Sequence, residues 1–287
     1  MLLRSMLFVP ADSPRKLAKA LGSRADALIL DLEDAVAPPQ KPAARAAAAA
    51  FIAEHASRLT ARLFVRINPL DSGLALDDLA TVVLPGLAGI MLPKTCSAAD
   101  VLRLGHYLDA LEARAGMIAG SVCIVPVATE TAQAMLTMQS YQPGIARLAA
   151  MTWGAEDLSA AIGAISNREE DGSLSPLYTL ANAMCLCAAA AAGVPAIDTL
   201  YADFRDTPGL EASCRQARRR GFRGAIAIHP DQVDVINAAF SPTEAEQASA
   251  RRVVDAFAAQ PAAGAVSIDG VMYDMPHLKQ ARRTLGL

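Results

Sequence analysis

The chain has 287 residues, of which 53% are hydrophobic and 19% are charged, and its formal net charge is −3. A chain of this length and apolar content can bury a substantial core, which excludes an intrinsically disordered protein. Its basic residues form no run longer than Arg218–Arg220, so nucleic acid and anionic membranes are not expected partners. A small soluble ligand is expected instead.

The five cysteines form no CxxC pair, and Cys123 lies inside an apolar, strand-like run. These features favour reduced thiols and a cytoplasmic location over disulfides or a zinc site. The first residues contain too short an apolar run for a secretory signal. The longest apolar run, Ala183–Ala192, is also shorter than the roughly 18 to 20 residues that cross a bilayer, so no membrane span is expected.

Short apolar runs alternate along the chain with stretches that are long enough for helices. The expected strands are Ser5–Val9, Ala27–Leu32, Leu63–Ile67, Gly89–Leu92, Val122–Val127, Arg147–Trp153, Ala196–Leu200 and Gly224–Ile228. The helical stretches between them include Pro42–Leu59, Ala98–Arg114, Thr131–Gln139, Leu177–Ala192 and Gly209–Gly221. Because crossover helices connect parallel strands, this order predicts an α/β fold, a (β/α)8 TIM barrel over residues 1–230. An open, doubly wound parallel sheet is the alternative.

Residues 231–287 are expected to form a C-terminal extension of helices and a hairpin that packs on the barrel and on a neighbouring subunit. One helix is expected at Asp231–Ala239, and a second is expected after Ser241 or Thr243, either of which could cap it, with Pro242 in its first turn. The pair Asp269-Gly270 between two apolar runs predicts a type I′ hairpin.

Polar side chains follow most of the expected strands. In a barrel, the carboxyl ends of the strands meet on one face, so these side chains should converge there. They are Asp31, Glu33 and Asp34 from strand two, Arg66 and Asn68 from strand three, Lys94 from strand four, Glu130 from strand five, Glu156 and Asp157 from strand six, and His229 from strand eight.

Glu130 and Asp157 are the candidate metal ligands. Burying a charged side chain at the end of a strand is costly unless a cation or a substrate compensates it. Mg²⁺ favours one or two carboxylates and completes its coordination with water and substrate oxygens, whereas zinc would require histidines that this region lacks. The alternative is that these two carboxylates only cap the helices that follow them.

Arg66 offers a planar fork for a substrate carboxylate, and the alternative is a structural ion pair with the acids after strand two. Lys94 could be a Schiff-base nucleophile, but neutralising the acidic cluster is the favoured interpretation. No catalytic role is assigned to His229, and Trp153 with Gly154 is expected to shape the pocket and allow close backbone approach. The chain contains no GxGxxG, Walker or GxSxG motif.

Several segments together resemble the citrate lyase β-subunit-like family of the HpcH/HpaI aldolase superfamily. The resemblance covers nearly the whole chain. Its segments are Arg4–Pro10, Asp31–Val36 with Lys41 and Arg45, Arg66–Asn68, Leu92–Lys94, Thr129–Thr131, Gly154–Leu158, Ala227–Pro230 and the tail from Asp269 to Asp274.

The resemblance implies a Mg²⁺-dependent barrel, commonly a homotrimer or a larger homo-oligomer, that makes or breaks a carbon–carbon bond in a 3-hydroxyacyl-CoA thioester. It implies that Glu130 and Asp157 bind Mg²⁺, that Arg66 and Glu130 bind substrate, and that Arg66 and Asp274 are catalytic residues, with Asp274 presented by a neighbouring subunit. Asp274 would transfer the proton, with a pKa raised by burial. Citramalyl-, malyl- or citryl-CoA would then yield a keto acid and acetyl-CoA. The alternatives are hydrolysis of the same thioester, or a subunit that works only in a citrate lyase complex with a carrier protein.

Overall fold

The structure is a computed structural model that describes residues 2–287, and it divides into two compact units. The first unit extends to Phe240 and the second comprises Ser241–Leu287. The boundary predicted after residue 230 precedes helix α9 (Gln232–Ala239), which packs on helix α8 and strand β8 of the first unit. The packing of the extension on the barrel and on a neighbouring subunit stays a prediction.

The first unit is a (β/α)8 barrel, as predicted. Its strands are β1 (Ser5–Pro10), β2 (Ala27–Asp31), β3 (Arg62–Arg66), β4 (Leu87–Leu92), β5 (Cys123–Pro126), β6 (Met151–Thr152), β7 (Ala196–Asp198) and β8 (Gly224–Ala227). They form one parallel sheet in the order β5-β4-β3-β2-β1-β8-β7-β6. Two isolated parallel bridges, Ile124 to Leu148 and Val127 to Thr152, connect β5 with the chain around β6 and nearly close the barrel.

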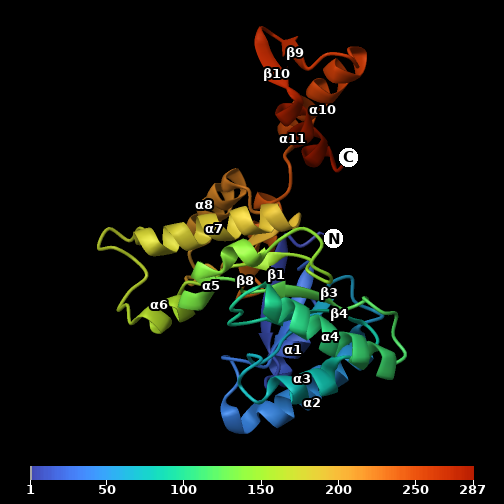
Figure 1. Ribbon diagram of the computed structural model, residues 1–287, viewed down its shortest axis with the longest axis vertical. Helices are drawn as coiled ribbons and strands as arrows, with labels where there is room; N and C mark the ends of the chain where they lie inside the picture. The colour runs from blue at the N-terminus through green and yellow to red at the C-terminus, as the bar shows by residue number, and fades with distance from the viewer. Residues whose placement is uncertain (1) are drawn as a thin grey trace. The chain divides into compact units, whose positions relative to one another are not determined.

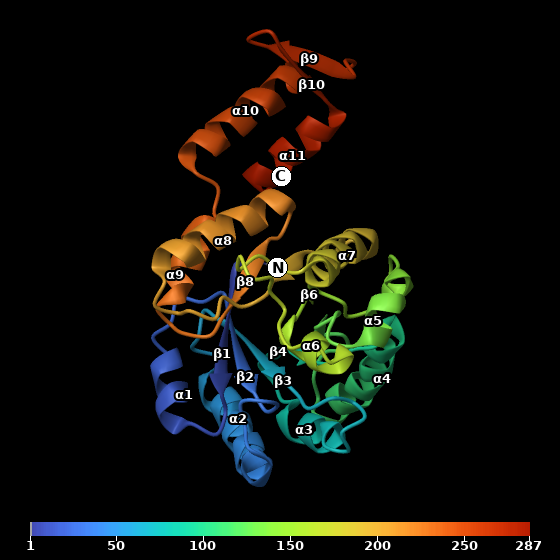
Figure 2. The ribbon, with the colours of Figure 1, turned by 90° about the vertical axis from the view of Figure 1, so that its left-hand side faces the viewer.

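Helices cover the outside of the barrel (Figure 2). They are α1 (Pro14–Ala20), α2 (Lys41–His55), α3 (Ala75–Val82), α4 (Ala98–Arg114), α5 (Ala132–Leu136), α6 (Glu156–Ile162), α7 (Pro176–Ala192), α8 (Thr207–Arg220) and α9, with short 3₁₀ turns η1 (Pro38–Gln40) and η2 (Met138–Ser140). The single helix predicted over Thr131–Gln139 is instead α5 followed by η2. Thr137 lies between them, and its hydroxyl donates to the Gln133 carbonyl and the Cys96 carbonyl, which competes with a continuous helix.

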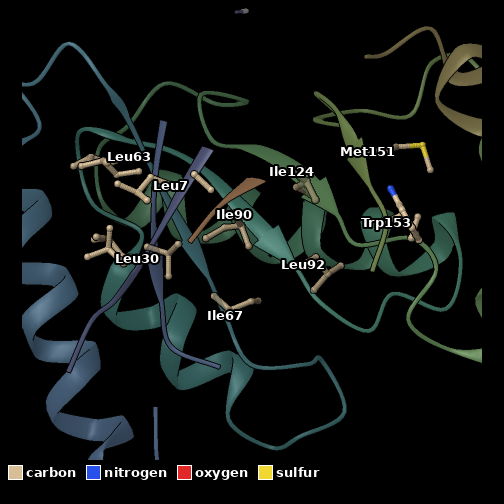
Figure 3. Close-up of a cluster of buried hydrophobic side chains, with 14 of the residues drawn as sticks. Leu7, Leu30, Leu63, Ile67, Ile90, Leu92, Ile124, Met151 and Trp153 are labelled. Carbon is tan, nitrogen blue, oxygen red and sulfur yellow. The ribbon is translucent and has the colours of Figure 1, made fainter. Parts of the chain in front are cut away.

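The strands are apolar on both faces because each face meets a different core. Met6, Ile29 and Phe64 belong to the cluster inside the barrel, and the alternate residues of the strands pack against the helices. Figure 3 shows part of this outer cluster, including Leu7 and Leu30. Burial on both faces explains the continuous apolar runs in the sequence.

The second unit has its own core and follows the predicted local signals. It contains α10 (Glu244–Ala259), β9 (Ala265–Ile268), β10 (Val271–Asp274) and α11 (Met275–Leu285), drawn in red tones in Figure 1. Thr243, rather than Ser241, caps α10 through a reciprocal pair with Glu246, so Pro242 lies before the helix. Asp269 and Gly270 both have positive φ, 52° and 79°, as a type I′ hairpin turn requires.

Among residues 2–287, none of the helices combines the length and the apolar character that a bilayer crossing requires.

Candidate active site

The carboxyl ends of the strands bring together the predicted acidic and basic side chains of the first half of the chain. β2 ends at Asp31, β3 ends at Arg66, and the segments after β4 and β5 carry Lys94 and Glu130. Asp157 lies in the first turn of α6, directly after β6. Direct contacts between these residues join them into one cluster.

Glu130 is nearly completely buried and has few partners. Its Oε2 accepts a hydrogen bond of 2.6 Å from the backbone N–H of Lys94. Burial raises the pKa of Glu130 to about 8, and the nearby charges of Asp157 and Glu33 raise it further. The hydrogen bond from the Lys94 N–H lowers the pKa of Glu130 and offsets only part of this rise. The charged form of Glu130 is therefore only partly compensated by the protein.

The segments that carry Glu130 and Asp157 are joined by a reciprocal hydrogen-bond pair. The Thr129 hydroxyl donates to the Gly154 carbonyl and accepts from the Gly154 N–H, each at 3.0 Å. A side chain at position 154 would begin 3.1 Å from Cγ and Oε1 of Glu130, so glycine there gives the carboxylate its space. A close approach to the backbone was predicted at Gly154, and the group that approaches it is the Glu130 side chain.

The alternative role of these two carboxylates as helix caps does not match the structure. The cap of α5 is Thr131, whose hydroxyl accepts from the Ala134 N–H. Helix α6 begins after Ala155 without a side-chain cap. Asp157, which is 30% exposed, instead places Oδ1 3.1 Å from the ammonium of Lys94.

Lys94 connects the acids of the cluster. Its Nζ lies 2.5 Å from Glu33 Oε1 and 3.3 Å from Asp34 Oδ2, in addition to its contact with Asp157. Burial works against the ammonium charge, but the hydrogen bond to Glu33 and the charges of Glu33 and Asp157 outweigh it and raise the pKa of Lys94. The side chain is committed to ion pairs, in line with the neutralising interpretation rather than with a Schiff-base nucleophile.

The backbone of Lys94 has a φ of 48°, a left-handed conformation that costs a non-glycine residue on the order of 1 kcal/mol. This conformation allows one residue to direct its N–H at Glu130 and its ammonium at the other acids.

Arg66 forms the ion pairs that were considered as its structural alternative. Its Nε and Nη2 donate to the two oxygens of Asp31 at 2.7 and 2.6 Å, and its Nη1 lies 3.0 Å from Glu33 Oε2. The guanidinium also stacks over the Phe8 ring, 4.4 Å from the centroid. Burial opposes its charge, but the bond to Asp31 outweighs burial and raises the pKa of Arg66. Its binding of substrate stays a prediction.

Asn68 and the segment around it are structural. Its side chain donates to Asp78 and accepts from the Lys41 ammonium, which also donates to the carbonyls of Leu32 and Glu33. These bonds fix the backbone on which Glu33 is carried.

One acidic residue of this face was missed by the sequence reasoning. Asp198 ends β7 and accepts a 2.7 Å hydrogen bond from the indole of Trp153, and burial raises its pKa. The signal was an acid inside the otherwise apolar run Ala196–Leu200. His229, to which no catalysis was assigned, stacks on Phe204 with ring centroids 4.9 Å apart.

Asp274 belongs to the second unit, whereas Arg66, Glu130 and Asp157 belong to the first. The raised pKa expected of Asp274 concerns its burial beside the thioester, and it stays a prediction. Asp274 is half-exposed, and its pair with His277, at 2.5 Å between Oδ1 and Nδ1, lowers the pKa of Asp274.

The cluster contains more carboxyl groups than cationic ones, and Glu33 Oε2 is buried without an aligned hydrogen bond. Among the described residues no group of three histidine, cysteine or acidic side chains is arranged to hold a metal. Glu130 and Asp157 could supply two oxygen ligands, leaving other positions to water and substrate. This donor set fits a hard divalent cation that keeps part of its hydration shell.

Comparisons with known proteins agree with this architecture. The family model of the HpcH/HpaI aldolase/citrate lyase family matches residues 4–230. Citrate lyase subunit beta of Haemophilus influenzae is 33% identical over 285 residues, which cover 98% of this chain and 95% of that protein. A (3S)-malyl-CoA thioesterase of Cereibacter sphaeroides is 35% identical over 286 residues, which cover 98% of this chain and 93% of that protein.

The solved structures include protein CitE of Mycobacterium tuberculosis in complex with magnesium, acetoacetate and coenzyme A. It has 34% sequence identity and a TM-score of 0.78, over 99% of this chain and 97% of that chain. The resemblance seen in the sequence motifs is confirmed: this chain belongs to the HpcH/HpaI aldolase/citrate lyase family.

Proposed function

We propose that this protein is a cytoplasmic, Mg²⁺-dependent carbon–carbon lyase that cleaves a 3-hydroxyacyl-CoA thioester to a keto acid and acetyl-CoA. Citramalyl-, malyl- and citryl-CoA are the candidate substrates. The observation that carries the proposal is the pair Glu130 and Asp157, two carboxylates joined through Lys94 in a cluster with excess acid. The magnesium, acetoacetate and coenzyme A bound to the related CitE protein support it.

Glu130 and Asp157 would hold the Mg²⁺ ion. The fit rests on the raised pKa of Glu130, whose charge is only partly compensated within the protein, and on the all-oxygen donor set. When bound, the ion supplies Lewis acidity toward the carboxylate and adjacent oxygen of the substrate.

Arg66 would bind the substrate carboxylate. Of the five N–H groups of the guanidinium, two are used by Asp31, and Nη1 faces Glu33 without an aligned hydrogen bond. Asp31 and the Phe8 ring hold the guanidinium plane in place, so its other N–H groups are oriented before substrate arrives.

Asp274 would move the proton. In the lyase direction a base removes the proton of the substrate hydroxyl, the carbon–carbon bond breaks to give the keto acid, and the enolate of acetyl-CoA accepts a proton. We assign this transfer to Asp274 of a neighbouring subunit in a homotrimer. In the free chain, His277 lowers the pKa of Asp274, and the ionised carboxylate that results can act as a base. Burial of Asp274 against the thioester would raise its pKa.

Hydrolysis of the same thioester is the second candidate, and the thioesterase relatives from Cereibacter sphaeroides favour it. It requires water, rather than the substrate hydroxyl, to be activated, and it yields free CoA. A third candidate is a subunit that acts on a carrier-bound acyl group, which the citrate lyase subunit beta relatives favour.

A substrate panel separates these candidates. Purified protein is incubated with malyl-, citramalyl- and citryl-CoA, with Mg²⁺ and then with chelator, and products are identified by mass spectrometry. Acetyl-CoA and a keto acid that disappear with chelator support the lyase, whereas free CoA and the intact hydroxy acid support the hydrolase. If none of the three reacts, the lyase proposal for free CoA thioesters is wrong and the carrier-dependent subunit is favoured.

A further inference from the structure

Lys94 contacts both residues to which we assign the cation. Its main-chain N–H donates to Glu130 Oε2 at 2.6 Å, and its ammonium lies 3.1 Å from Asp157 Oδ1. The two contacts differ in kind. The main-chain bond orients Glu130 and leaves its other oxygen available, whereas the ammonium places a positive charge directly against Asp157.

A divalent cation that binds Asp157 therefore lies close to a second positive charge, the Lys94 ammonium. Two positive charges within a few ångströms repel each other, so an ion on Asp157 and the Lys94 ammonium at Oδ1 weaken each other's binding. The ammonium has other partners that it can keep, because Glu33 Oε1 lies 2.5 Å from Nζ and Asp34 Oδ2 lies 3.3 Å from it.

Glu33 is suited to hold the ammonium away from Asp157. Its side chain is only 3% exposed, and the bonds of Lys41 to the carbonyls of Leu32 and Glu33 fix its backbone. Asp34, by contrast, is 59% exposed and its contact with Nζ is longer. Glu33 is therefore the dominant anchor of the ammonium.

We propose that Lys94 is an internal counter-ion that competes with the divalent cation for Asp157, and that Glu33 sets the strength of this competition. This inference rests on the cation site of the proposed function. It makes Lys94 and Glu33 positioning residues that determine how tightly the site binds its cation before any substrate is present.

The experiment measures cation binding without a thioester. Mn²⁺ is titrated into wild type, Lys94→Met, Glu33→Gln and the double variant, with free Mn²⁺ followed by electron paramagnetic resonance, and Mg²⁺ is used to displace it. Lys19→Met, which removes an exposed lysine of α1, is the matched control for the change in net charge. Thermal unfolding of each variant checks that it is folded.

Lys94→Met should bind Mn²⁺ about tenfold more tightly, because the competing charge is gone. A supporting residue of purely structural role would give the opposite sign, a loss of about 10- to 100-fold. Glu33→Gln should weaken binding several-fold in the wild-type background and have little effect in the Lys94→Met background, because Glu33 acts through Lys94. Lys19→Met should bind as wild type does.

Unchanged or weaker binding by Lys94→Met overturns the inference. Equal weakening by Glu33→Gln in both backgrounds overturns the role of Glu33, because it means that the carboxylate acts by its own charge. If Lys94→Met does not fold, unchanged binding by Glu33→Gln alone overturns the inference. A wild-type protein that binds no divalent cation refutes both this inference and the proposed metal site, whereas wild-type binding with an unaffected Lys94→Met refutes the inference only.

Discussion

The two ends of the barrel both bury a glutamate, and the surroundings of these two side chains are opposite. At the amino-terminal end, Glu112 accepts from Arg147 at 2.8 and 2.6 Å and from the backbone N–H groups of Val122 and Gly120 at 2.7 and 2.8 Å. Burial works to raise its pKa, but these bonds outweigh it and lower the pKa of Glu112 to about 2. At the carboxyl end, Glu130 has the Lys94 N–H and a pKa of about 8.

The difference separates a structural carboxylate from the one to which we assign a function. Glu112 is satisfied within the protein, so it stabilises the fold and offers nothing to a ligand. Glu130 is buried among other acids, so its ionised form is destabilising until a cation or substrate compensates it. Burial alone does not distinguish the two; the number of donors around each carboxylate does.

Glu130→Gln should have the largest effect on turnover, since it removes a ligand of the proposed cation. Divalent-ion affinity should fall by more than about 100-fold and turnover should fall with it, while folding stability is unchanged or higher because a carboxyl group whose ionisation the fold disfavours is removed. Mn²⁺ titration and urea unfolding measure the two effects, with the exposed Glu54→Gln as the control. Unchanged affinity would show that Glu130 is not a ligand.

Asp274→Asn should lower turnover by about 100-fold, the usual size of a general acid–base contribution, and leave divalent-ion binding unchanged. It sharpens the comparison with a third carboxylate, which is half-exposed and has a lowered pKa. Steady-state kinetics and Mn²⁺ titration are measured on the same preparation. Wild-type turnover would remove Asp274 from the mechanism.

Glu112→Gln should affect stability instead of chemistry. Breaking its buried pair with Arg147 should cost about 3 kcal/mol in the free energy of unfolding, with unchanged turnover per folded molecule. Urea unfolding is measured for Glu112→Gln, for Arg147→Met and for the double variant. The double variant should lose less free energy of unfolding than the sum of the losses in the two single variants. A stable but inactive Glu112→Gln protein would contradict the division between the two ends.

The two glutamates should also give opposite pH dependence in the presence of a chelator. The lowered pKa of Glu112 provides stability above about pH 4.5, which is lost as the pH falls toward 2. The raised pKa of Glu130 means that ionising it costs stability as the pH rises from about 4.5 toward 8. Urea unfolding across this range should show both trends.

Each trend has its own variant as a control. Glu112→Gln should reduce the loss at acidic pH, Glu130→Gln should reduce the loss toward alkaline pH, and added Mg²⁺ should reduce only the second. A Glu130→Gln protein with the wild-type slope between pH 4.5 and 8 would argue against the raised pKa.

Local sequence patterns predicted much of the fold and part of the site. Helix Ala98–Arg114 matches its predicted bounds, and the hairpin at Asp269-Gly270 forms as its turn residues indicate. Helices α3 and α11 were not anticipated; α3 has only eight residues, too few turns for a clear apolar period. Asp198 was overlooked because its partner, Trp153, lies 45 residues away in the chain, directly after β6.

The sequence alone determined the eight apolar strand runs and the edge of the sheet at which Glu130 and Asp157 follow them, because strand order and connectivity fix which ends of parallel strands meet. The partners of each charge were decided only by the tertiary structure. Lys94 and Glu33 are 61 residues apart in the chain, yet their charged atoms lie 2.5 Å apart. Local periodicity places a side chain on a face of the barrel, but an ion pair depends on distances of a few ångströms between segments that only the closed barrel brings together.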